Sequence, residues 1–262
     1  IIIAKKALIF LKIPLIAVNH SNNIKRSLQA DIIFAVNNNI LKKIKEKSSR
    51  KNYFLIPNSI EIGKKIEPKK LTISKRKTLI LGSMGRLSPE KNFNELIKTT
   101  KFLIDFGYKI KLKIAGTGVE EKHLKNLSKK LNLEKNIEFL GWIDQKKFFD
   151  QIDIFILLSK EETFGLVFLE AAKYQKLIIA SNNDGTKMIL KNQKNAIIIN
   201  QKRNISEQIL KNLQDLEENP KKIKQLIGNS YRNLSQNYSN KIISKKIISI
   251  FANSHLYPKN SN

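Results

Sequence analysis

Two carboxylates, Glu162 and Glu170, stand eight positions apart in a stretch that could bind a charged ligand. The apolar, β-branched run 152–158 before them predicts a buried strand, and 166–176 has the length and composition of a helix. Glu162 is then expected in the loop between them, with Gly165 opening the helix and Glu170 about one turn inside it. Helix N-termini bind anions, so a phosphate flanked by hydroxyl groups would fit. Two solvated acids without a function explain the same residues equally well.

A second anion-binding loop is predicted earlier in the chain. The apolar run 79–84 predicts a strand, and the glycine-containing loop after it carries two cations, Arg86 and Lys91. A helix is expected to begin at Asn92, with Glu95 three residues on as its capping partner. A strand, a glycine loop, two cations and a helix start together predict a phosphate-binding site.

Other candidate residues carry weaker signals. The Gly116-Thr-Gly118 step could simply mark a tight turn after a strand. His20 follows another predicted strand, where open α/β sheets place ligands, but a single loop histidine usually has no function. Asp153 and Asp184 are interpreted as structural. The sequence has no cysteine, which excludes disulfides and thiolate metal sites, and it contains no Walker loop, paired-histidine metal motif or Gly-x-Ser-x-Gly elbow.

The elements that must position these residues alternate between strand and helix. Six strands are predicted in the second part of the chain, at 79–84, 111–115, 136–142, 152–158, 177–180 and 196–199. This alternation is typical of a doubly wound parallel sheet. Further helices are predicted from Pro220 and over 240–252. A second α/β sheet is indicated upstream by one helix and three strands, at 38–47 and at 13–19, 30–36 and 53–56.

The 262 residues divide into four predicted parts. Residues 1–62 are interpreted as the C-terminal part of a first Rossmann-like domain, and 63–77, a lysine-rich stretch, as a linker. Residues 78–236 would form a second Rossmann-like domain, and 237–262 an amphipathic helix returning towards the first domain, followed by a tail. Because the chain begins at Ile1, we expect it to lack its original N-terminus. The early apolar segment is too short to span a bilayer and has no signal-peptide cleavage site.

The net charge of +27 suggests nucleic-acid binding at first sight. The basic residues are nevertheless scattered in pairs, and only six of the 49 are arginine, the better bidentate ligand of phosphates. Together with the many Ile and Asn residues, this pattern is typical of AT-rich coding sequence, which we favour over a nucleic-acid partner. Weak attraction to an anionic membrane stays open, because scattered lysines still add up electrostatically.

Several motifs line up in order along the chain. They are Gly85-Arg86-Leu87 with Glu90-Lys91, Ile114-Ala-Gly116-Thr-Gly118, Phe139-Leu-Gly141, and Ser159 ahead of Glu162-x-Phe-Gly-Leu-Val-x-Leu-Glu170-Ala, preceded by Pro14 to His20, Ala30-Asp31 and Ile56-Pro57-Asn58. The ordered set resembles glycosyltransferase family 4, and the likeness covers nearly the whole chain. The resemblance implies a retaining enzyme of the GT-B fold, with two Rossmann-like domains of which the first is incomplete here.

The resemblance also implies a role for each matching residue. Arg86 and Lys91 would bind the diphosphate of the donor and Glu170 its ribose hydroxyls, without a metal ion or other cofactor. Glu162 would face the donor sugar, and His20 would line the sugar site from the other domain. Donor contacts are further implied for two loop glycines and for the start of the helix, at Gly85, Gly116, Phe164, Gly165 and Leu166.

The implied reaction moves a sugar from a nucleotide-diphosphate-sugar to a glycan or lipid-linked acceptor, with retention. It would serve cell-envelope polysaccharide or lipopolysaccharide biosynthesis in the cytoplasm, with peripheral attachment to the inner face of the membrane as an open option. The chain departs from the family pattern at two places. Gln175 and Leu177 stand where a glycine and a proline are usual, and Asp184-Gly185 and Met188 stand where paired glycines and a third Glu are usual. These changes leave open a decayed, non-catalytic homologue that keeps the fold, and the charge leaves open a basic membrane-surface or nucleic-acid binder.

Overall fold

The computed structural model describes residues 14–21, 23–48 and 52–253. The chain forms two compact units, one from residues 1–62 together with 236–262, and the other from residues 63–235. Residue 13, at which the first predicted strand begins, and the tail after residue 253 lie outside the described residues.

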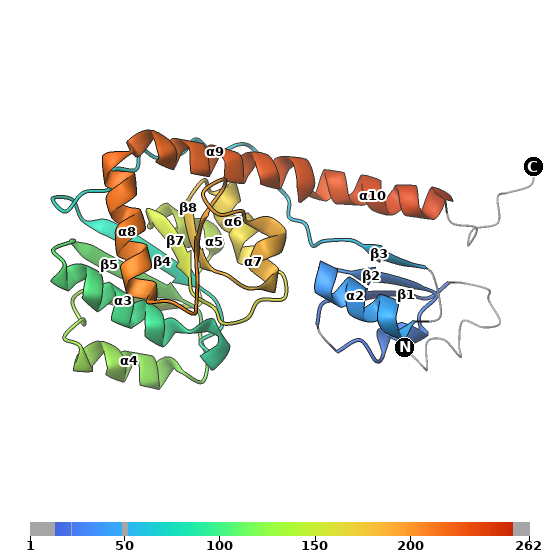
Figure 1. Cartoon of the computed structure of the whole chain (residues 1–262), viewed down its shortest axis with the longest axis horizontal. Helices are drawn as coiled ribbons and strands as arrows, with labels where there is room; N and C mark the ends of the chain where they lie inside the picture. Colours follow the sequence, from blue (N-terminus) through green and yellow to red (C-terminus); the bar gives the residue numbers. More distant parts are fainter. Residues whose placement is uncertain (1–13, 22, 49–51, 254–262) are drawn as a thin grey trace, which may run out of the picture. The chain divides into compact units, whose positions relative to one another are not determined.

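The larger unit, residues 63–235, is built on a six-stranded sheet in which all neighbouring strands are parallel. The strands lie in the order β6-β5-β4-β7-β8-β9, and Figure 1 labels β5, β4, β7 and β8 of this sheet. Their bounds are β4 (Leu79–Met84), β5 (Ile110–Ala115), β6 (Ile137–Gly141), β7 (Ile154–Leu157), β8 (Leu177–Ser181) and β9 (Ile197–Ile199). All six strands predicted from the sequence are confirmed, close to their expected bounds, and so is the doubly wound parallel sheet.

The strand order places the switch of this sheet between β4 and β7. From β4 the chain moves outward to β5 and β6, and it then returns past β4 to β7 before it continues to β8 and β9. Because parallel crossovers are right-handed, the two directions put their helices on opposite faces. Both faces of the central strands are therefore covered, which explains why every residue of the Ile-Phe-Ile-Leu run in β7 is buried.

Helices cover both faces of the sheet (Figure 1). They are α3 (Phe93–Asp105), α4 (Glu121–Lys130), α5 (Gln145–Asp150), α6 (Leu166–Lys173), α7 (Asp184–Ile189), α8 (Ile205–Glu218) and α9 (Pro220–Asn237), with a short 3-10 helix η2 (Pro89–Lys91) before α3. Helix α3 packs against both α4 and α8. One continuous apolar core joins the sheet to α3, α4, α8 and α9 and includes Leu81, Ile97, Ile154 and Leu213.

The predicted capping partnership between Asn92 and Glu95 is wrong. Asn92 adopts a left-handed conformation, with φ of 57°, and its side chain makes no bond to the start of α3. The Asn92 Nδ2 instead donates to the carbonyl oxygen of Leu158, at 3.2 Å. That carbonyl lies just after a buried strand, away from water, so it needs a protein donor and takes this amide from the helix start.

The segment 63–77, predicted as a linker, has no regular helix or strand but is attached to the larger unit. Ile73 is buried in the core. The Lys69 ammonium donates to the carbonyl oxygen of Asp150 at 2.9 Å, and the Gln175 amide donates to that of Ile66. The segment therefore runs along the edge of the sheet where the parallel strands begin.

The smaller unit contains a parallel sheet of β1 (Ile16–Asn19), β2 (Ile32–Ala35) and β3 (Tyr53–Leu55), in that order. A 3-10 helix η1 (Ser27–Gln29) and helix α2 (Asn38–Lys47) connect the strands. Helix α10 (Asn240–Asn253) packs on this sheet through Ile243, which is buried with Ile32, Phe34 and Ile56. In the part of the chain that the structure describes, every helix is too short or too polar to cross a membrane.

Candidate functional site

The switch between β4 and β7 brings two loops together at the carboxyl ends of the strands. The loop after β4 begins at Gly85 and includes η2, and the loop after β7 runs from Leu158 to Gly165. The backbone N–H of Lys160 donates to the carbonyl oxygen of Glu90 at 2.8 Å and joins the two. Open α/β sheets bind ligands at this position, and the fold places both predicted anion-binding loops there.

Glu162 and Lys91, 71 positions apart in sequence, form an ion pair at this junction. The Lys91 Nζ lies 2.5 Å from Glu162 Oε1, and the Ser159 hydroxyl donates to the same oxygen at 2.9 Å. The Glu162 side chain is 9% exposed and that of Lys91 is 20% exposed. Because water screens this pair poorly, each charge depends on the other. A lysine ammonium has three N–H donors, so Lys91 can bind Glu162 and an anionic ligand together.

The start of α7 fixes the loop that carries Glu162. The N–H of Gly185 donates to the carbonyl oxygen of Glu162 at 2.8 Å, and a Cβ at position 185 would lie 2.7 Å from the Glu162 Cβ. Asn183 caps α7 through Thr186, and its Nδ2 also donates to the carbonyl oxygen of Ser159 at 3.1 Å. Only glycine allows these two loops to approach so closely.

Glycines also hold the loop after β4 against the loop after β5. Gly116 has φ of +122°, and a Cβ there would lie 2.0 Å from the carbonyl oxygen of Gly85. A Cβ at Gly118 would lie 2.3 Å from the carbonyl oxygen of Leu87. The N–H of Leu87 donates to the carbonyl oxygen of Thr117 at 2.9 Å. The Gly-x-Gly step, ambiguous in the sequence, is thus a packing requirement of the loop that carries the predicted cations.

The Gly116→Ala substitution is expected to lower the free energy of unfolding by about 3 kcal/mol, because it adds both a clash and backbone strain. Gly141→Ala is the matched control. Gly141 also has positive φ, +61°, but a Cβ there would meet no atom within 4 Å. Its cost should be the left-handed strain alone, about 1 kcal/mol. Urea unfolding followed by circular dichroism measures both, and equal losses would contradict the close-packing interpretation.

Glu170 lies on α6 and has a hydrogen-bond partner of its own. Gly165 begins the helix with φ of +81°, and a Cβ there would lie 2.6 Å from the Phe168 ring. The Gln145 Nε2 donates to Glu170 Oε1 at 2.7 Å. Burial raises the pKa of Glu170, while the hydrogen bond from Gln145 and the charge of Lys173 oppose this rise. The carboxylate is therefore half-buried and oriented by an amide.

The remaining predicted site residues lie in different surroundings. Arg86 is exposed in the loop after β4, Phe164 is buried and Leu166 is exposed at the start of α6. His20 belongs to the smaller unit, where it is exposed directly after β1. All of the predicted site residues except His20 therefore belong to the larger unit.

Sequence reasoning missed several residues that contact the two carboxylates. Gln145 and Gly185 had no assigned role, and Ser159 was named only as part of a motif. For Gln145, the one signal in the sequence is its position at the start of a helix that follows a strand. Asp153 accepts a hydrogen bond from the N–H of Ile80 at 2.9 Å, which is a structural role. Within residues 14–21, 23–48 and 52–253, no group of three or more His, Cys, Asp or Glu side chains could hold a metal ion.

These features define a Rossmann-like domain with cationic and carboxylate side chains at the sheet switch. Residues 63–233 match the family described as Glycosyl transferases group 1, and the chain belongs to this family. An uncharacterized glycosyltransferase of Haemophilus influenzae is 32% identical over 171 residues, which are 64% of this chain and 47% of the relative. The O-antigen biosynthesis glycosyltransferase WclY of Escherichia coli is 30% identical over 141 residues, 52% of this chain and 38% of the relative. Each match thus spans less than half of the relative's length.

Solved structures share the fold. Anabaena HepE, solved in complex with UDP and glucose, superposes with a TM-score of 0.80 at 19% identity, covering 97% of this chain and 75% of HepE. A mutant of Staphylococcus aureus TarM, solved with fondaparinux, alpha-GlcNAc-glycerol and UDP, gives a TM-score of 0.77 at 22% identity, over 91% of this chain and 50% of TarM. The predicted GT-B type α/β fold is confirmed.

Proposed function

We propose that this protein transfers a sugar, with retention, from a nucleotide-diphosphate-sugar to a glycan or lipid-linked acceptor, as a member of glycosyltransferase family 4. The observation that carries the proposal is the cluster of Lys91, Glu162 and Ser159 at the sheet switch, directly before the N-terminus of α6. The structure of HepE with UDP and glucose supports the donor class. Relatives named for O-antigen and capsular polysaccharide biosynthesis support a role in building the cell envelope.

The leaving group sets the main chemical demand of this reaction. Breaking a glycosyl–phosphate bond places negative charge on a nucleoside diphosphate, and fixed cations and helix N–H groups stabilise such charge. In the proposal, Arg86 and Lys91 supply the cations and the N-terminus of α6 supplies the N–H groups. Lys91 keeps its bond to Glu162 and offers its remaining N–H donors to a phosphate oxygen. No metal ion takes part in this scheme.

The two carboxylates have separate tasks in this proposal. Glu170, oriented by Gln145, accepts hydrogen bonds from the ribose hydroxyls. Glu162, whose charge Lys91 balances, faces the donor sugar. The pair is therefore not the acid and nucleophile of a glycosidase, because one carboxylate is occupied by ribose.

The Arg86→Ala substitution tests the proposal through nucleotide binding. Loss of a charge-assisted contact to the diphosphate should weaken UDP or GDP binding roughly tenfold or more in calorimetry. Arg76→Ala is the matched control, because Arg76 is an exposed arginine that precedes β4, whereas Arg86 follows the other end of that strand. An unaltered protein that binds neither nucleotide would contradict the proposal and favour the decayed, non-catalytic homologue.

A further inference from the structure

A second cavity lies in the larger unit, at the edge of the sheet opposite to Lys91 and Glu162. It has a volume of about 910 Å³ and is lined by residues of the segment 65–72 and of α9. Gln175, two positions before β8, lines the same cavity. All strands of this sheet are parallel, so their first residues share one edge, away from the proposed donor site. We call this space the basic cavity.

Positive charge dominates the lining of the basic cavity. Six cationic side chains line it with a single acid, Glu67; the cations are Lys65, Lys69, Lys70, Lys221, Lys224 and Arg232. Glu67 is exposed and lies 3.4 Å from the Lys65 ammonium, so it balances one charge at most. The ratio of six to one exceeds that of the whole chain, with 49 basic and 22 acidic residues.

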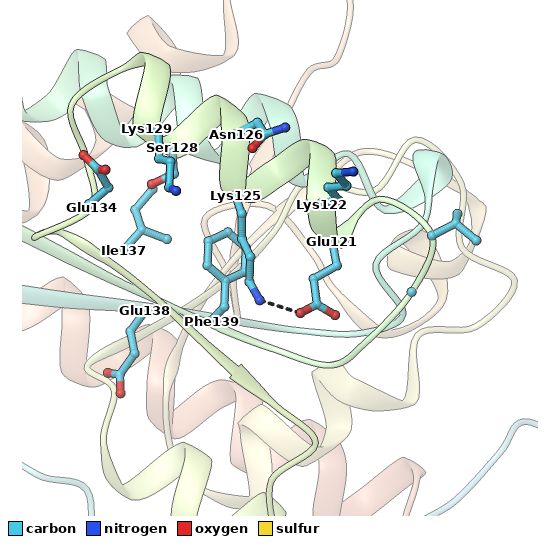
Figure 2. Close-up of a pocket in the computed structure, with 12 residues that line it drawn as sticks. Glu121, Lys122, Lys125, Asn126, Ser128, Lys129, Glu134, Ile137, Glu138 and Phe139 are labelled. Carbon is cyan, nitrogen blue, oxygen red and sulfur yellow. Dashed lines mark hydrogen bonds and ion pairs between the residues drawn. The ribbon is translucent and has the colours of Figure 1, made fainter.

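Another cavity of similar size shows that lysine abundance alone does not produce this lining. It has a volume of about 860 Å³ and lies between α4 and β6 (Figure 2). Three lysines and three glutamates line it: Lys122, Lys125, Lys129, Glu121, Glu134 and Glu138. Figure 2 shows Lys125 paired with Glu121, at 2.7 Å. Charge is balanced there and unbalanced in the basic cavity.

Among the described residues, most cations of the basic cavity have no carboxylate within ion-pair distance. Of the side chains that the structure describes, no carboxylate forms an ion pair with Lys70, Lys221 or Lys224. The Arg232 guanidinium donates to the amide oxygen of Asn229, at 2.9 Å. Like charges that gather around one space repel each other, so an anion bound among them relieves this repulsion.

The basic cavity also has an apolar wall. Ile223 and Ile227 of α9 face it together with Leu71, and Gly228 leaves open space where any other residue would place a side chain. The first turn of α9, with Pro220 and Lys221, adds the partial positive charge of a helix N-terminus. The volume lies within the range of small-molecule sites. The lining therefore combines a cationic part with an apolar part.

We propose that the basic cavity binds a phosphate-bearing amphiphile, an anion with at least two negative charges attached to an apolar group. The cations of α9 and of the segment 65–72 bind the phosphate, and Leu71, Ile223 and Ile227 contact the apolar group. The ligand is a soluble phosphate ester or the headgroup region of an anionic lipid. This site is separate from the proposed donor site and does not depend on it.

Calorimetric titration with decyl phosphate tests the proposal, in an Arg86→Ala background that disables the proposed donor site. The triple variant Lys70→Gln, Lys221→Gln, Lys224→Gln changes exposed residues only and should weaken decyl phosphate binding roughly tenfold or more. The triple variant Lys122→Gln, Lys125→Gln, Lys129→Gln removes the same charge from the balanced cavity and should change binding by less than about twofold. Gly228→Trp, which fills the space and keeps the charge, should weaken decyl phosphate more than inorganic pyrophosphate.

Vesicle sedimentation distinguishes the two sources of the ligand. Selective, Lys70/Lys221/Lys224-dependent binding to phosphatidylglycerol vesicles, with none to phosphatidylcholine, identifies a lipid headgroup; decyl phosphate binding without vesicle binding identifies a soluble ester. Equal weakening by the two lysine variants, or no decyl phosphate binding by the protein, would overturn the proposal. UDP binding by both lysine variants in the native Arg86 background should be unchanged, so failure here is separable from failure of the proposed function.

Discussion

Replacing Lys91 with methionine is expected to weaken UDP or GDP binding roughly a hundredfold, the largest loss of function predicted for any single side chain here. The substitution removes a cation from the proposed diphosphate site. It also leaves the Glu162 carboxylate, 9% exposed, without its partner at 2.5 Å. An uncompensated charge in such a place destabilises the fold. Because the pair keeps some contact with solvent, the free energy of unfolding should fall by only about 1–3 kcal/mol.

A double variant separates the two effects of Lys91. The double variant Lys91→Met, Glu162→Gln leaves no charge unpaired. Its glutamine oxygen can still accept the hydrogen bond from the Ser159 hydroxyl. Stability should therefore recover while nucleotide affinity stays low. Lys101→Met, in an exposed helical pair with Asp105, is the charge-matched control and should change stability by about 0.5 kcal/mol or less. Calorimetry and urea unfolding measure both quantities. Native affinity in the single variant would refute a role for Lys91 in donor binding.

Glu170→Gln is expected to weaken UDP or GDP binding roughly ten- to a hundredfold without loss of stability at neutral pH. The proposed ribose contacts need an ionised acceptor, and hydrogen bonds to charged groups are the stronger kind. Glutamine keeps the size of the side chain and can still bind Gln145. Lost affinity without lost stability is the result expected where a residue is kept for function and not for the stability of the fold. Glu138→Gln, at an exposed carboxylate of β6, is the control and should leave affinity unchanged.

The stability of the native protein, compared with that of Glu170→Gln, should change with pH in a defined direction. Burial raises the pKa of Glu170 in the folded protein above its ordinary value, so the folded state binds more protons between the two pKa values. Glu170 therefore contributes its full stabilisation at pH values below the pKa of the unfolded state. This stabilisation is lost as the pH rises through the raised pKa of the folded state. The free energy of unfolding of the native protein should fall relative to that of Glu170→Gln across this interval. Urea unfolding between about pH 4 and 8 measures the difference, and an opposite slope would contradict the burial of this carboxylate.

Nucleotide affinity, in contrast to stability, should increase as the pH rises. The ionised carboxylate is the form that accepts two ribose hydroxyls, so affinity falls as pH decreases through the raised pKa of Glu170. In Glu170→Gln this dependence should disappear. Calorimetry at several pH values measures it in both proteins.

Local pattern predicted most of the fold. The central strands β7 and β8 were found because buried parallel strands are short apolar runs bounded by polar loops. Helix α2 was predicted with its observed bounds, Asn38–Lys47, because its apolar residues recur with helical period. The start of α6 after Gly165 was correct for the same kind of local reason. The failure at Asn92 has the opposite origin, since its amide binds a carbonyl 66 positions away.

The amino-acid sequence by itself determined the alternation of strand and helix and the placement of Glu162 and Arg86 in loops after strands. These are properties of residues close together in the chain. The tertiary structure alone decided that Lys91 and Glu162 form a pair. It also decided that Gln145 orients Glu170, and that scattered lysines line one cavity while those of another are balanced by acids. The physical reason is the strand order, which sets β4 beside β7 although β5 and β6 come between them in the chain, and no local periodicity specifies which strands become neighbours.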